Sequence, residues 1–294
     1  MQNVHIVTDS CANFANQHFL HQHPVTVVPN RISIAGKTYR EGVDLGSEEA
    51  LRLIRGQTYA PLVTSPSVTD YVDIYNRLAR SNDAIISIHA SRELYPSWQS
   101  AKTAARQLAG RCQIEVVDSQ MVCAAQGMLV KVAARAIQEH NNLDDIVRTV
   151  RGAVERTYSI YYVETVAYLL QNKIMSVSHS ILGTMLGIKP FLSMEHGHII
   201  LVEKVRTRAQ AVDRLVEFVV EFTDVEDVVL LQSKPHMSEQ TRMLQDRLAV
   251  EFPGQYFPFA MYSPSMAAMI GADATGVVVL EKEITEEFED DDDF

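Results

Sequence analysis

The sequence predicts an α/β protein with two α/β domains. Three observations support this prediction. Short runs rich in Val and Ile alternate with longer segments of helical period, polar loops follow the apolar runs, and the pattern changes near residue 157. Repeated strand–loop–helix units predict a parallel sheet covered by helices on both faces. At 294 residues the chain is long enough for two domains of ordinary size.

The first half of the chain alternates extended and helical patterns. Strands are predicted at "VHIVTDS", "AIISIHAS" and "IEVVDS", with further extended chain at "VTVVPNRISI". Five helices are predicted, over residues 47–55, 66–80, 97–108, 121–139 and 142–156. In the second of these helices, one face carries Val68, Tyr71, Ile74, Tyr75 and Leu78. This order predicts a first domain, residues 1–156, built mainly on a parallel sheet flanked by helices.

The second half brings its strands closer together. Strands are predicted at 158–163, 187–193 and 199–204, and "EHGH" between the last two suits a hairpin. Helices at about 208–222 and 237–250 enclose a further strand at "VEDVVLL". Antiparallel neighbours mixed with helices predict a second domain, residues 157–280, with a mixed sheet.

The charge of the chain is concentrated at its end. The net charge is −11, and residues 281–294 hold nine acids and one Lys, which is −8 of that total. This segment is predicted to be a disordered acidic tail. No basic block or stripe offers a surface to phosphates, so nucleic-acid binding is not expected.

Other compositional signals exclude several classes of protein. The three cysteines, Cys11, Cys112 and Cys123, have no CxxC spacing and do not suggest a disulfide framework or a zinc site. The spacing of His18, His21 and His23 resembles metal-ligand spacing, but no carboxylate or Cys accompanies them, so no metal is predicted. The start of the chain lacks a signal-peptide pattern and no apolar stretch is long enough to span a membrane, which predicts a cytoplasmic protein.

Polar loops follow the strands of the predicted parallel sheet. "TDSCAN", "HASRELYPS" and "DSQMVCAAQG" each lead from a strand into a helix and are rich in hydroxyl and carboxyl groups. In open parallel sheets, ligands bind beyond the carboxyl ends of the strands, and helix N-termini attract anions. The same residue types also cap helices without any ligand, so both interpretations of each loop stay open.

The order of these and later segments resembles the DegV family of bacterial fatty-acid-binding proteins, which include the B subunits of fatty acid kinase. The resemblance rests on "VTDSCANF", "TSPS", "SRELYPSWQSA", "VVDSQMVCAAQG", "LGIKPFL" and "VEKVRTRAQA", and covers the chain to about Leu280. It implies two α/β domains that enclose a long-chain fatty acid, or a similar lipid, in an apolar tunnel between them. It also implies a non-enzymatic carrier without a cofactor, which presents the lipid to a separate kinase subunit.

The resemblance also implies site residues. The family's first polar segment corresponds to Thr64 and Ser65, and its second to Ser91 with Ser97 close behind; all four are expected to hold the lipid head group. The "VRTRAQA" segment corresponds to a family segment near the tunnel entrance, so that Arg206 and Arg208 are candidates for contact with the kinase.

This chain departs from the family pattern in three segments. Tyr95-Pro96 replaces a Ser-Gly pair, and Asn172-Lys173-Ile174 replaces G-G-R-I. The family histidine near the C-terminus is missing, because its position is taken by Met269 or by Asp273, depending on the alignment. His89, just before Ser91, is a candidate substitute for it.

The stretch "VTSPSVTDY" leaves three interpretations for Ser65: a nucleophile, a helix cap or a ligand contact. We expect Ser65 to cap a helix that begins at Pro66, and the same geometry to receive an anion. The alternative function is a small hydrolase or phosphoryl-transfer enzyme acting through Ser65, Asp9 or His89. It would require His89 within hydrogen-bond reach of a serine and a third group to orient the ring.

Overall fold

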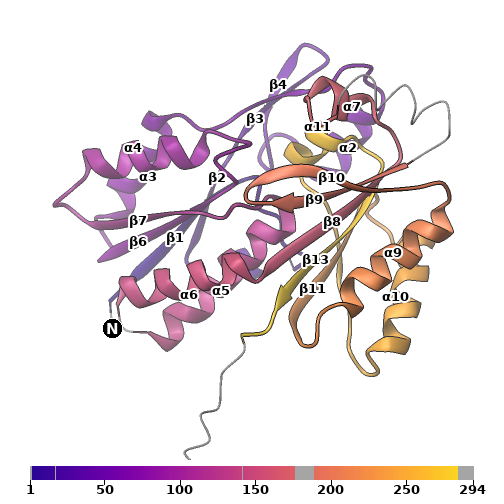
Figure 1. Ribbon diagram of the computed structural model, residues 1–294. Helices are drawn as coiled ribbons and strands as arrows, with labels where there is room; N and C mark the ends of the chain where they lie inside the picture. The colour runs from indigo at the N-terminus through magenta and orange to yellow at the C-terminus, as the bar shows by residue number, and fades with distance from the viewer. Residues whose placement is uncertain (1, 17, 141, 176–188, 284–294) are drawn as a thin grey trace, which may run out of the picture.

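The computed structural model describes residues 2–16, 18–140, 142–175 and 189–283. Two large sheets lie on either side of one central helix, and a small third sheet lies beside the first (Figure 1). The predicted mixed α/β architecture, with a parallel sheet followed by a mixed one, is confirmed. The predicted disorder of the acidic tail and the start of the strand predicted at 187–193 lie outside the described residues.

The first sheet is parallel throughout and has the order β2-β1-β6-β7. Its strands are β1 (Val4–Asp9), β2 (Val25–Val28), β6 (Ala84–His89) and β7 (Gln113–Asp118). All six residues of β6 are buried, as expected for a central strand covered on both faces. Helices α3 (Val68–Leu78) and α4 (Ser97–Gln107) cover one face of this sheet, and α5 (Cys123–Glu139) and α6 (Leu143–Glu155) cover the other.

The small sheet is antiparallel and has the order β4-β3-β5. It consists of β3 (Arg31–Ile34), β4 (Lys37–Arg40) and β5 (Leu62–Thr64). A two-residue turn joins the first two strands, with φ of 51° at Ala35 and 78° at Gly36, the geometry that tight hairpins require. Two helices, α1 (Phe19–Gln22) and α2 (Ser47–Arg55), lie in the same part of the chain. The sequence predicted α2 and the extended chain, but not this pairing.

The second large sheet is mixed and has the order β10-β9-β8-β13-β11-β12. Its strands are β8 (Thr157–Val163), β9 (Lys189–Glu195), β10 (His198–Val205), β11 (Val225–Gln232), β12 (Phe259–Met261) and β13 (Ala274–Glu281). β9 and β10 form the predicted hairpin, and β11 pairs in parallel with β12. Helices α9 (Arg208–Val220) and α10 (Glu239–Glu251) pack on one face. Sequence patterns did not predict β12, β13, α7 (Ala167–Gln171) or α11 (Pro264–Ile270).

Helix α5 lies between the two large sheets (Figure 1) and packs against β1 and β6 on one side and against β8, β11 and β13 on the other. One hydrophobic cluster therefore includes residues from both sheets. Gly127 lets the loop after β1 approach α5, because a Cβ atom there would lie 1.9 Å from the Asn13 carbonyl oxygen. The division of the chain into domains after residue 156 stays a prediction.

Within the residues that the structure describes, no helix is long and apolar enough to cross a membrane.

Candidate functional site

Three loops meet at the carboxyl edge of the parallel sheet. The register pairs Thr8 of β1 with Ile88 of β6, and His89 of β6 with Asp118 of β7, so the strands end at nearly the same level. Helix α3 precedes β6 in the chain and runs antiparallel to it, from the carboxyl edge of the sheet to the amino edge. Helix α4 is the next helix after β6 and begins at the carboxyl edge. The N-termini of both helices therefore lie at the carboxyl edge, where parallel sheets bind ligands.

The segment before α3 differs from the sequence prediction. Helix α3 begins at Val68, and its N-cap is Ser67, whose Oγ accepts from Asp70 N–H at 3.2 Å. The Asp70 carboxylate accepts from Ser67 N–H at 2.8 Å, which completes a capping box. The prediction that Ser65 caps this helix was wrong, because Ser67 lies at the correct spacing and has an acidic partner three residues later.

Ser65 is therefore left without a structural role for its hydroxyl. Its side chain is buried, with 8% of the residue exposed, and Ser65 Oγ has no hydrogen-bond partner among the described residues. The neighbouring Thr64 ends β5 and is exposed. A buried hydroxyl without a partner costs about 1–3 kcal/mol of folding free energy, so Ser65 Oγ is a candidate contact for a ligand.

Ser97 is in the same situation at the start of α4. It is the first residue of the helix and is fully buried. Its Oγ makes no well-formed hydrogen bond in the described part of the chain, although it lies close enough to the Tyr71 hydroxyl to offset part of the rise in the pKa of Tyr71 that burial causes. The preceding Pro96 occupies the N-cap position and provides no side-chain cap. Two more buried hydroxyls that make no well-formed hydrogen bond to the described residues, Ser159 and Tyr161, lie near each other on β8 of the other sheet. Ser65 and Ser97 stand apart from these because both lie next to the N-terminus of a helix.

Ser91 has a different environment from the other predicted head-group residues. Its hydroxyl donates to the Gly197 carbonyl at 2.7 Å and accepts from Glu93 N–H at 3.2 Å. Ser91 thus joins the loop after β6 to the β9–β10 hairpin. The Tyr95 hydroxyl makes a second such connection, donating to the Ser265 carbonyl of α11 at 3.0 Å. Tyr95, which stands in place of the family's Ser-Gly pair together with Pro96, therefore places a buried aromatic ring between the loop after β6 and helix α11.

His89 is fully buried and both of its ring nitrogens have partners. Nδ1 lies 3.0 Å from Asp9 Oδ2 and 3.2 Å from the Tyr71 hydroxyl, and Nε2 lies 2.7 Å from Ser87 Oγ. Tyr75 donates to Ser87 Oγ at 2.7 Å, which directs the serine proton toward Nε2 and places the ring proton on Nδ1. A head group would have to displace one of these partners in order to reach His89.

Asp9 is the buried anion of this network. Burial alone would raise the pKa of Asp9, but hydrogen bonds from His89, Ala90 N–H and Gln126 outweigh it and lower the pKa. The carboxylate therefore stays ionised and holds the ring of His89 in place.

The order Ser87–His89–Asp9 meets the geometric requirement set for the alternative enzymatic function. A serine lies within hydrogen-bond reach of a histidine, and an aspartate orients the ring. All three side chains are fully buried beneath α3 and α4, where Tyr71 and Tyr75 cover the sheet. Ser87 lies within the strand and not on a turn, so a substrate would have no access to its hydroxyl in this arrangement.

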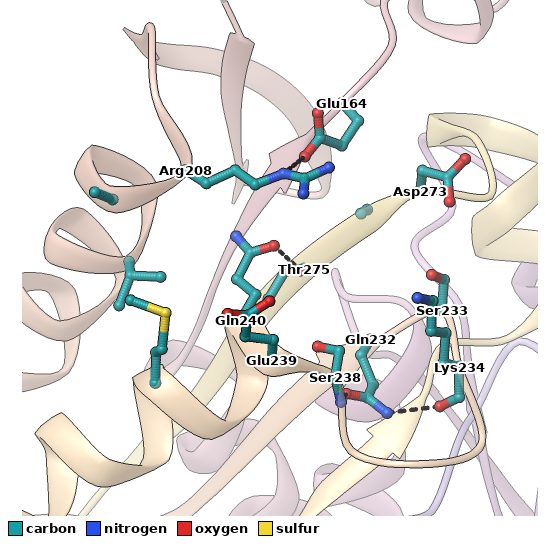
Figure 2. A pocket seen from close by; sticks show the side chains of 14 residues that line it. Glu164, Arg208, Gln232, Ser233, Lys234, Ser238, Glu239, Gln240, Asp273 and Thr275 are labelled. Carbon is teal, nitrogen blue, oxygen red and sulfur yellow. Dashed lines mark hydrogen bonds and ion pairs between the residues drawn. The ribbon is translucent and has the colours of Figure 1, made fainter.

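A polar pocket of about 380 Å³ lies at the carboxyl ends of β8 and β11 (Figure 2). Figure 2 shows Glu164 and Arg208 facing each other at one side and Asp273 at another. Arg208 Nε donates to Glu164 Oε1 at 3.0 Å, and Lys189 Nζ lies 3.0 Å from Glu164 Oε2. Burial would raise the pKa of Glu164, but the two cations lower it.

Arg208 therefore has an intramolecular partner, although its side chain is 76% exposed. Arg206 is also exposed.

The two candidates for the position of the family histidine lie in different surroundings. Met269 is a buried member of the hydrophobic cluster, and Asp273 pairs with Arg55 at 3.1 Å. The Asn172 amide donates to the carbonyls of Ala268 and Met269, both at 3.0 Å. Lys173 has a φ of 59°, the left-handed conformation that favours the glycine of the family pattern. The sequence did not reveal these contacts, because they join segments about 100 or more residues apart.

Among residues 2–16, 18–140, 142–175 and 189–283, no group of three His, Cys, Asp or Glu side chains could hold a metal ion.

The chain matches the sequence model of the DegV family, described as "Uncharacterised protein, DegV family", over residues 3–282. It is 29% identical over 286 residues to a DegV domain-containing protein of Caldanaerobacter subterraneus, covering 96% of this chain and all of that one. It is 25% identical over 279 residues to the protein DegV of Bacillus subtilis, covering 94% of this chain and 98% of that one.

Solved structures share the fold. A fatty acid binding DegV family protein of Streptococcus agalactiae superposes with a TM-score of 0.85 at 24% identity, over 96% of this chain and all of that one. The fatty acid kinase B3 protein of Streptococcus pneumoniae, loaded with linoleic acid, superposes with a TM-score of 0.82 at 17% identity, over 95% of this chain and all of that one.

Proposed function

Because the chain belongs to the DegV family, we propose that it is a non-enzymatic carrier that binds a long-chain fatty acid or a similar lipid. In this proposal the acyl chain lies in the apolar interior between the two large sheets. Ser65 and Ser97 hold the head group at the carboxyl edge of the parallel sheet. The solved relatives named above bind fatty acids, which supports the same class of ligand here.

The observation that carries the proposal is a pair of buried hydroxyls, Ser65 Oγ and Ser97 Oγ, that make no well-formed hydrogen bond to the described residues. A carboxylate can accept a hydrogen bond from each hydroxyl, and it would lie beside two helix N-termini that favour negative charge. Each methylene of a buried acyl chain adds about 0.8 kcal/mol, so the chain supplies the affinity and the hydroxyls orient the ligand.

The other predicted contacts have weaker support. Thr64 is exposed at the end of β5, so it could reach only a head group that lies near the surface. Ser91 would have to give up its bond to Gly197, and His89 would have to release Ser87, Asp9 or Tyr71. We therefore assign the head group first to Ser65 and Ser97.

The partner in this proposal is a fatty acid kinase subunit. Arg206 and Arg208 precede and begin α9, and both are exposed. Arg208 is held toward the polar pocket by Glu164, so of the two side chains Arg206 is the better placed to reach a partner surface. The lipid bound to an Arg206→Glu variant should no longer be phosphorylated by the kinase, and unchanged phosphorylation of the bound lipid would remove Arg206 from the interface.

The lipid proposal is tested by extraction and mass spectrometry of the purified protein. We expect a fatty acid or similar lipid in stoichiometric amount. Each lost hydrogen bond to the carboxylate should weaken retention by about 1.5–3 kcal/mol, so a Ser65→Ala/Ser97→Ala variant should retain far less lipid. Ser159→Ala is the matched control, because it removes from the second sheet another buried hydroxyl that makes no well-formed hydrogen bond to the described residues. Lipid lost from the control and kept by the double variant would place the head group elsewhere.

The hydrolase alternative is favoured only by the Ser87–His89–Asp9 geometry. It is tested by treating the folded protein with a fluorophosphonate and locating the modified residue. We expect no labelling of Ser87, because its hydroxyl is fully buried. Labelling that disappears in His89→Gln, together with ester hydrolysis, would establish an enzyme.

A further inference from the structure

Glu41 is a buried carboxylate that lines a second, smaller pocket. The residue follows β4 and is 4% exposed. The pocket has a volume of about 200 Å³ and lies between the loop after β1, helix α1 and the segment that precedes α11. This is smaller than sites for drug-sized ligands, so only a small molecule or one end of a larger one would fit.

Four hydrogen bonds are donated to the carboxyl group of Glu41. Ser10 Oγ accepts from Asn30 N–H at 2.8 Å, so its proton points to Glu41 Oε2 at 2.6 Å. Ser265 Oγ accepts from Asn30 Nδ2 at 3.1 Å and likewise donates to Oε2 at 2.6 Å. Asn30 Nδ2 and Ser265 N–H add donors at 3.0 and 2.7 Å. These four donated hydrogen bonds favour the ionised form of the carboxyl group and oppose the effect of its burial.

The charge of Glu41 is not neutralised within the described part of the chain. Its partners are hydroxyl, amide and backbone groups, and no Lys, Arg or His of the described residues pairs with it. Burial raises the pKa of Glu41 despite these hydrogen bonds. A buried charge without a counter-ion is unfavourable, and a cation in the adjacent pocket would compensate it.

The remaining walls of the pocket specify the kind of cation. Asn13 Oδ1 is buried and has no hydrogen-bond partner in the described ranges, which provides a second acceptor. Leu20, Val27 and Val43 supply apolar surface, and Val43 is 58% exposed at the outer rim. Acceptors beside an apolar mouth suit a ligand with a cationic donor at one end and a hydrocarbon part at the other.

We propose that this pocket binds the ammonium group of a small aliphatic amine, with Glu41 as its counter-ion and Asn13 Oδ1 as a second acceptor. Among the described residues, Ser265 N–H alone donates to Glu41 Oε1, so this oxygen has a lone pair for an ammonium N–H. This site does not depend on the proposed lipid site. The pocket includes neither Ser65 nor Ser97.

The test uses pentylammonium chloride as the probe and 1-pentanol as its neutral counterpart, with saturation-transfer NMR on the full chain in sodium chloride. We expect saturable binding of pentylammonium and at least tenfold weaker binding of pentanol, as for the loss of a charge-assisted hydrogen bond of about 1.5–3 kcal/mol. Glu41→Gln should weaken pentylammonium binding to a similar extent. Equal binding of the two probes, or full binding by folded Glu41→Gln, would overturn the proposal.

A second pair of variants keeps the test decisive if Glu41→Gln does not fold. Val43→Phe fills the mouth of the pocket from an exposed position and should abolish binding of the probe. Val202→Phe makes the same change on β10, where Val202 is 43% exposed and does not line the pocket, and should bind like the unchanged chain. Binding by Val43→Phe equal to that of Val202→Phe would overturn the proposal independently.

Discussion

The guanidinium group of Arg55, at the end of α2, pairs with the carboxylate of Asp273, which precedes β13, at 3.1 Å. The same guanidinium donates to the Ala272 carbonyl at 3.1 Å. These contacts join residues that are more than 200 positions apart in the chain, and they pair the carboxylate of Asp273 with a cation. An aspartate near the family's histidine position is therefore tolerated because the fold itself supplies the counter-charge.

We expect Arg55→Met to lower the free energy of unfolding by about 0.5–1 kcal/mol, because both partners are more than a third exposed and solvent screens the pair. Urea denaturation measures the change, and the loss should shrink at high salt. Arg52→Met is the control, since Arg52 makes only an exposed contact with Glu49 at 3.7 Å on the same helix. Equal losses for both variants would mean that the Asp273 pair contributes nothing specific.

Ser65 and Ser67 should respond in opposite ways to removal of the hydroxyl. Ser67→Ala removes the N-cap of α3 and should cost about 1 kcal/mol of unfolding free energy. Ser65→Ala removes a hydroxyl without a partner, so stability of the lipid-free protein should stay unchanged or rise. Chemical denaturation after delipidation measures both. A large loss for Ser65→Ala would show that its hydroxyl has a structural partner in the lipid-free protein.

Gly127 and Gly152 are matched positions inside neighbouring helices. Gly127→Ala should destabilise the protein by about 1–3 kcal/mol or more, because the new Cβ atom would lie 1.9 Å from the Asn13 carbonyl oxygen. Gly152→Ala meets nothing within 4 Å in α6 and should stabilise the protein by about 0.5–1 kcal/mol. Thermal unfolding of the two variants gives the comparison, and similar shifts in Tm would contradict the close approach of α5 to the loop after β1.

Asp9 makes stability depend on pH in the acid range. Its pKa in the folded protein is below the ordinary value of 3.8, so the stabilisation is fully present above that value. It is lost as the pH falls from about 4 through the lowered pKa. Asp9→Asn should lower stability at neutral pH and flatten the acid limb of the stability profile.

The control for this prediction is Asp118→Asn. It removes the carboxylate at the end of β7, which is paired with Arg92 at the surface of the loop. Stability measured by urea denaturation from pH 2 to 7 should keep its acid limb in this variant. An unchanged acid limb in Asp9→Asn would show that other carboxylates dominate the pH dependence.

The alternation of strands and helices could be predicted from the sequence, because it depends on short-range patterns. The helix at 47–55 has the predicted bounds, and α4, α5 and α6 begin or end within two residues of theirs. The β9–β10 hairpin followed from the Gly197 turn, where φ is 84°. The sequence patterns did not predict strand β13, although its Val-rich run lies in the middle of the second sheet, because a short apolar run does not distinguish a buried strand from a helix segment.

The residues of the candidate site could be predicted only in part from the sequence. The resemblance to the DegV family predicted Thr64, Ser65, Ser91 and Ser97 as head-group contacts, because the polar segments occur in the family's order along the sequence. Sequence order could not show that Ser91 donates to Gly197, or that Ser67 caps α3 in place of Ser65. A hydrogen bond depends on distance and angle, and those are set by the packing of segments that are remote in the chain.

By itself, the sequence determined the α/β class, most of the elements, the family and the set of hydroxyls from which a head-group site could be drawn. Only the tertiary structure decided which of those hydroxyls lack partners, that Asp273 pairs with Arg55, and that Glu41 is buried beside a pocket. The physical reason is that periodicity and capping act over a few residues. The partners of a buried polar group come from whatever the folded chain brings within about 3 Å of it.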